Sequence, residues 1–92
     1  MIHSFACQDT EALFKRRPVT RFKNIERVAR RKLNMLQASS ILQDLKVPPG
    51  NKLELLKGQR KNWYSIRIND QWRLCFVWLD KGAHEVKIID YH

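Results

Sequence analysis

The stretch Trp63–Leu79, WYSIRINDQWRLCFVWL, carries the strongest structural signal in this chain of 92 residues. Apolar and polar side chains alternate on both sides of Asn69–Gln71, which has the composition of a tight turn. The pattern predicts an antiparallel hairpin in which Ile68 lies opposite Trp72. One face of the hairpin would then be apolar and pack against the rest of the core. That face is expected to carry Tyr64, Ile66, Ile68, Trp72, Leu74 and Phe76.

Two arginines fall on the opposite face of the predicted hairpin. The same register pairs Arg67 with Arg73, and like charges directly across a strand pair destabilise a sheet by up to about 1 kcal/mol. Either both arginines are solvated or an anion lies near them. A five-residue loop, Asp80–His84, would continue the register into a third strand. It would place Tyr91 opposite Arg73, with His92 one step beyond.

The first half of the chain has helical patterns. Ile2–Phe5 alternates like a short strand, and Asp9 is placed to cap a helix that follows it. Within Arg21–Ala38 the apolar residues recur at helical spacing, and Ser39–Leu45 indicates another short helix. Helices followed by a meander of strands predict a two-layer α+β fold. The length fits a single domain over residues 1–92.

The charge is strongly positive and unevenly distributed. Eighteen Lys and Arg stand against nine Asp and Glu, and nine of the eighteen lie between Lys15 and Lys32, where Glu26 is the one acid. Such a surface favours a polyanionic partner, either nucleic acid or an acidic protein, although a solvated helix face is the simpler alternative. The exposed arc of the predicted helix carries Lys23, Arg27, Arg30 and Arg31.

Several classes of protein do not fit the composition. No run of 18 apolar residues exists, and the first residues lack the features of a signal peptide, so we expect a cytoplasmic protein that does not enter a membrane. The His and Cys residues have no zinc-type spacing, so we expect no metal site.

Four segments together resemble the HigB-type toxins of bacterial type II toxin-antitoxin modules, within the wider RelE-like group. They are DTEALF (Asp9–Phe14), PPGNKLELLKG (Pro48–Gly58), SIRINDQWRLCFVW (Ser65–Trp78) and IDYH (Ile89–His92). The segments extend over nearly the whole chain. The resemblance therefore implies a RelE-like version of the two-layer fold expected above.

The resemblance also implies an activity and partners. It implies a ribosome-dependent mRNA endoribonuclease that needs no metal or other cofactor, cleaves messenger RNA in the ribosomal A site, and inhibits translation and growth. The expected partners are the ribosome, messenger RNA and a HigA-like helix-turn-helix antitoxin, whose complex with the toxin binds operator DNA. The matching family positions are Lys57, Arg73, Asp90, Tyr91 and His92. Glu54 stands where one branch of the family has a histidine.

These residue types suit RNA cleavage, which needs a base, an acid and cations for the charge that builds on phosphorus. Arg73 is the expected cation, assisted by Lys57 and Arg67, and Tyr91 can stack on a splayed base. The proton-transfer groups are His92, Glu54 and Asp90, whose order the sequence leaves open.

The basic residues Lys23, Arg27, Arg30 and Arg31 are expected to bind ribosomal RNA through its phosphates, with Arg67 as a further RNA-binding residue. A second hypothesis is a non-catalytic RNA-binding, ribosome-binding or regulatory module, in which Glu54 marks a degenerate active site.

Overall fold

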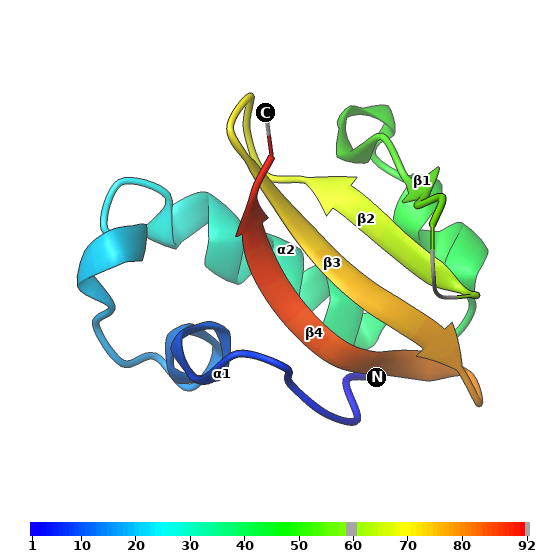
Figure 1. Ribbon diagram of the computed structural model, residues 1–92, viewed down its shortest axis with the longest axis horizontal. Helices are drawn as coiled ribbons and strands as arrows, with labels where there is room; N and C mark the ends of the chain where they lie inside the picture. Colours follow the sequence, from blue (N-terminus) through cyan, green and yellow to red (C-terminus); the bar gives the residue numbers. More distant parts are fainter. Residues whose placement is uncertain (59–60, 92) are drawn as a thin grey trace.

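A computed structural model describes residues 1–58 and 61–91 as helices packed on one face of an antiparallel sheet (Figure 1). The elements are α1 (Gln8–Phe14), η1 (Thr20–Phe22), α2 (Glu26–Ala38), η2 (Leu42–Lys46), η3 (Pro49–Asn51), β1 (Glu54–Leu55), β2 (Trp63–Arg67), β3 (Trp72–Leu79) and β4 (Gly82–Asp90), where η denotes a 3₁₀ helix. The four strands follow the order β1-β2-β3-β4. The expected two-layer α+β fold is confirmed. No helix in the described ranges is long and apolar enough to cross a membrane.

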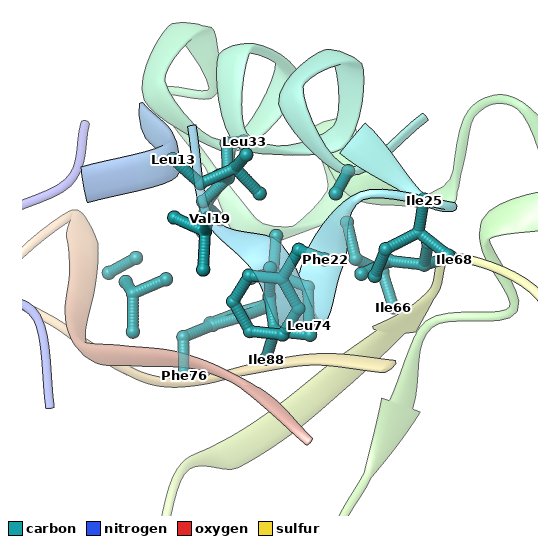
Figure 2. Packing of buried hydrophobic residues seen from close by; sticks show 14 of the residues in the cluster. Leu13, Val19, Phe22, Ile25, Leu33, Ile66, Ile68, Leu74, Phe76 and Ile88 are labelled. Atoms are coloured by element: carbon teal, nitrogen blue, oxygen red, sulfur yellow. The ribbon is translucent and has the colours of Figure 1, made fainter. Parts of the chain in front are cut away.

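The hairpin of β2 and β3 has the predicted register. Tyr64 lies opposite Phe76, and Ile66 lies opposite Leu74. Figure 2 shows the apolar face of this hairpin meeting side chains from the helical half of the chain. The fully buried members of this core include Leu13, Phe22, Leu33, Ile66, Leu74 and Phe76. Burial of apolar area on this scale is the main term that stabilises the fold.

The helical half differs from the prediction in its details. The helix expected at Arg21–Ala38 is divided into η1 and α2, because Ile25 has a non-helical backbone (φ −118°, ψ 3°). The break lets both Phe22 and Ile25 enter the core, with at most 5% of either residue exposed. Asp9 does not cap α1. It lies in the first turn, and its carboxylate is 3.5 Å from Arg21 Nε.

The N-terminal segment lies beside the outer edge of β4 (Figure 1). Ile2 and Phe5 form isolated parallel bridges with Ala83 and Val86, so the short strand expected at Ile2–Phe5 is reduced to single bridges. These contacts cover an edge that would otherwise expose unpaired backbone groups.

The turn between β3 and β4 is shorter than the sequence suggested. Asp80 and Lys81 form a two-residue turn, with φ values of 51° and 62°, in place of the five-residue loop Asp80–His84. Two left-handed residues match the right-handed twist of the flanking strands, and this match favours the short turn. The predicted pairing of Arg73 with Tyr91 is wrong, because Arg73 lies opposite Ile89.

A bulge in β4 determines which face carries the end of the chain. The register between β3 and β4 shifts between Cys75 and Val77, and Glu85 adopts a left-handed φ of 52° on β4. An extra residue in one strand exchanges the two faces of every residue that follows. The bulge therefore places Tyr91 on the face of the sheet that carries Arg73.

Candidate functional site

Arg73 lies near the start of β3, on the face of the sheet that points away from the helices. The residue is 6% exposed. Its Nε donates to Ser65 Oγ at 2.8 Å, and its Nη2 donates to the Lys52 carbonyl at 2.7 Å and, more weakly, to the Ser65 carbonyl at 3.4 Å. These bonds hold the planar guanidinium in one orientation, as its rigid fork of donors allows.

Two further side chains contact the same guanidinium. Nη1 lies 3.8 Å from Glu54 Oε1, and the ring centroid of Tyr91 is 5.5 Å from Arg73 Cζ. Glu54 reaches the site from β1, where it lies opposite Ser65, and Tyr91 reaches it from the end of β4. The structure thus brings together three site residues chosen from the sequence. Tyr91 comes beside Arg73 diagonally, because the true register differs by two residues from the predicted one and leaves the face unchanged.

Arg67 lies opposite Arg73, as predicted from the hairpin. The arginines also have carboxylate partners, since Arg67 Nη2 donates to Asp70 Oδ1 and Arg73 faces Glu54. The chain itself supplies negative charge beside the like-charged pair. Asp70 is fully exposed, so solvent screens its pairing with Arg67.

Asp90 is held by Gln71, a residue of the turn between β2 and β3. Gln71 Nε2 donates to Asp90 Oδ2 at 3.1 Å, and the Gln71 carbonyl accepts from the Tyr91 N–H at 2.5 Å. The turn is itself ordered by Asn69 Oδ1, which accepts from the Gln71 and Trp72 N–H groups at 2.8 Å. Figure 1 shows the end of β4 beside this turn.

Ser65, Lys52 and Gln71 are the site residues that sequence reasoning missed. A small hydroxyl residue between two apolar ones, on the predicted face of Arg73, was the available signal for Ser65. Lys52 acts through its carbonyl, so its side chain gave no signal.

Two of the expected catalytic residues are not part of this contact set. Lys57 is exposed two residues beyond β1 and forms no hydrogen bond with Arg73, Glu54 or Tyr91 in the described part of the chain. His92 lies outside the described residues.

The Cys75 thiol shares the face of Arg73 but does not suit nucleophilic chemistry. The residue is fully buried. Burial raises the pKa of its thiol to about 11, although Arg73 and Lys87 oppose the shift. The thiol is therefore protonated at neutral pH. Because the thiolate is the nucleophilic form of cysteine, Cys75 does not suit this role.

An open groove of about 890 Å³ on the surface of the helical layer is lined by Lys23, which precedes α2, and by Arg27, Arg30 and Arg31 of α2. Three of the four predicted RNA-binding cations there, Lys23, Arg27 and Arg31, are exposed. Arg30 is different, because all three of its guanidinium nitrogens have internal partners. They donate to the Leu13 carbonyl at 3.1 Å, to Glu26 Oε1 at 2.6 Å and to the Arg17 carbonyl at 3.2 Å.

The fold matches that of a solved toxin-antitoxin assembly. The structure of the YoeB-YefM complex from Staphylococcus aureus has a chain that superposes with a TM-score of 0.61, at 22% sequence identity, over 100% of this chain and 98% of that chain. At this identity the likeness shows the fold, a small α+β architecture of helices on an antiparallel sheet.

A family model identifies the chain more narrowly. The model described as "RelE-like toxin of type II toxin-antitoxin system HigB" matches residues 11–92, so the chain belongs to the HigB-like toxin family. Toxin HigB-1 of Vibrio cholerae is 49% identical over 60 residues, which cover 65% of this chain and 63% of that protein. An uncharacterized protein of Haemophilus influenzae is 47% identical over 53 residues, covering 58% and 52%. The matched segments thus span less than two thirds of either relative.

Proposed function

We propose that this toxin is a ribosome-dependent endoribonuclease that cleaves messenger RNA in the ribosomal A site, without a metal ion, and thereby inhibits translation and growth. One observation carries the proposal. The buried Arg73 is fixed between Glu54 and Tyr91 on one face of the sheet, with the Arg73 Nη1 only 3.8 Å from the Glu54 carboxylate. A phosphate that binds Nη1 would therefore lie beside a carboxylate and an aromatic ring.

This arrangement supports cleavage by attack of the 2′-hydroxyl. The 2′-oxygen bonds to the adjacent phosphorus and gives its proton to a base, while the 5′-oxygen leaves and receives a proton from an acid. The products are a 2′,3′-cyclic phosphate and a 5′-hydroxyl. In the proposed mechanism, Arg73 stabilises the charge that builds on the phosphoryl oxygens, and Tyr91 stacks on a base. Glu54 is the proposed base, and His92 is the proposed acid.

The remaining predicted residues take supporting roles in this proposal. Asp90, held by Gln71, orients the end of the chain, and Lys57 and Arg67 add positive charge for the RNA backbone. The exposed cations Lys23, Arg27 and Arg31 bind ribosomal RNA. The proposed antitoxin is a HigA-like helix-turn-helix protein that neutralises the toxin in the cytoplasm and carries the complex to operator DNA.

The activity is tested by primer extension on a translated messenger after induced expression. Wild type should produce new 5′ ends, and these should disappear in Glu54→Gln and Arg73→Lys. Both substitutions keep a side chain of similar size. Thermal melting checks that the two variants remain folded. Wild-type growth arrest without new 5′ ends would overturn the proposal.

A second candidate function is a non-catalytic ribosome-binding module. The low exposure of Arg73, 6%, favours it, because a guanidinium bonded to Ser65 and Lys52 can serve the fold alone. In that case Glu54→Gln would leave growth arrest unchanged, whereas the triple Gln variant of Lys23, Arg27 and Arg31 would abolish it.

A further inference from the structure

Lys32 is the one strongly buried cation on α2. It belongs to the basic segment, yet it is 8% exposed, and its Nζ lies 2.5 Å from Asn51 Oδ1. Burial, together with the nearby charges of Arg31 and Arg67, lowers the pKa of its ammonium group. A buried cation with a neutral amide partner is unfavourable for stability, and such groups are common at functional sites.

The amide that receives this bond is itself fixed on both sides. Asn51 is fully buried, and its Nδ2 donates to Met35 Sδ at 3.0 Å, to the Leu45 carbonyl at 3.1 Å and, more weakly, to the Val47 carbonyl at 3.4 Å. With its donors committed to these acceptors, the amide presents its oxygen to Lys32. Lys32 and Asn51 therefore attach η3 firmly to α2.

The next residue along the chain contacts the candidate site. Lys52 has a left-handed backbone (φ 46°, ψ 57°), and its N–H donates to the Pro49 carbonyl at 3.1 Å. Its own carbonyl accepts from Arg73 Nη2 at 2.7 Å. Glu54, two residues further on, begins β1 and reaches Arg73 Nη1. The segment that follows Asn51 thus supplies one contact to Arg73, through the Lys52 carbonyl, and leads directly to the other, Glu54.

We propose that Lys32 and Asn51 are positioning residues of the active site, which hold the Lys52 carbonyl in place and so direct the guanidinium of Arg73. The role rests on the endoribonuclease activity proposed above. Neither residue contacts the RNA. Lys32 has a different task from the exposed cations of its helix, because it orders the site and does not dock the protein.

The test compares two substitutions of the same kind. Lys32→Met keeps a long unbranched side chain and removes the buried charge, which offsets part of the loss of its hydrogen bond. Lys46→Met removes an exposed lysine from η2 and controls for net charge. Cleavage of a defined messenger on purified ribosomes should show kcat reduced on the order of tenfold or more in Lys32→Met, with KM for ribosomes within about twofold of wild type. Lys46→Met should match wild type in both.

A second measurement is independent of activity. The Nε–Hε resonance of Arg73 in a ¹⁵N NMR spectrum, assigned by its loss in Arg73→Lys, should move in Lys32→Met and stay in place in Lys46→Met. Wild-type cleavage with an unchanged kcat in Lys32→Met would overturn the positioning role, and so would an unmoved Arg73 resonance. A rise in KM alone would also contradict it, because that result indicates docking. A wild type without cleavage would reject the proposed function, and the resonance would still test the contact.

Discussion

The arginines of this protein serve different purposes that follow from their partners. Arg30 extends from α2 to the carbonyls of Leu13 and Arg17, which lie at and beyond the end of α1. The last carbonyls of a helix attract positive charge, and the guanidinium of Arg30 binds the Leu13 carbonyl of α1 together with the Arg17 carbonyl beyond it. Arg27, three residues earlier, is exposed on the groove. The sequence pattern does not distinguish these two arginines, but Arg30 has internal partners and Arg27 is exposed to solvent.

Arg30→Gln is therefore expected to destabilise the fold, whereas Arg27→Gln is not. Loss of the charged bonds to Leu13, Arg17 and Glu26 should lower the free energy of unfolding by about 1–3 kcal/mol. Arg27→Gln should change it by less than about 0.5 kcal/mol. Urea denaturation of the two variants checks both values. Equal stability would show that the bonds of Arg30 contribute nothing to the contact between α1 and α2.

Among the elements, the bulge in β4 has the largest effect on the site. It lets Ala83 and Val86 both face the core, although strict alternation would put residues three positions apart on opposite faces, and it returns Tyr91 to the side of Arg73. The bulge depends on the left-handed backbone of Glu85. Left-handed geometry is tolerated by Asn and strongly disfavoured for β-branched residues.

Glu85→Val should therefore be less stable than Glu85→Asn, by about 1–2 kcal/mol. Both substitutions remove the carboxylate together with its contacts, so the difference between them isolates the backbone. Chemical denaturation measures the stability, and the cleavage assay should show a larger loss for the Val variant, because Tyr91 is displaced. If the two variants are equally stable, the bulge does not depend on the conformation at Glu85.

The same elements explain how far the sequence could predict the site. The alternation of Trp63–Leu79 has period two and a short turn, so it specified the faces and the pairing of Arg67 with Arg73. The turn has positive φ at Asp80 and Lys81, neither of which is glycine. The bulge at Glu85 was hidden because Ala83, the core residue that precedes it, fell within the predicted loop Asp80–His84. The burial of Lys32 was equally hidden, because it depends on Asn51 from a distant turn.

In the molecule as a whole, the sheet separates two surfaces. The helices cover one face of the sheet (Figure 1). The groove of Lys23, Arg27 and Arg31 belongs to the helical layer, whereas Arg73 and Glu54 belong to the other face of the sheet. Under the proposed function, docking and cleavage would be performed by different layers of a very small domain. Groups without shared partners contribute independently to a free energy.

The effects of changes on the two surfaces should multiply. Replacing Lys23, Arg27 and Arg31 by Gln should weaken ribosome binding and reduce the slope of log Kd against log salt by about two to three, as expected for lost phosphate contacts. Glu54→Gln should reduce kcat by about 10²–10⁴-fold and leave ribosome binding intact. The combined variant should then lose kcat/KM by the product of the separate losses, within about twofold.

Ribosome sedimentation over a salt series and single-turnover cleavage supply the two readouts. A combined loss much smaller than the product would mean that the cationic groove also takes part in positioning the RNA for cleavage.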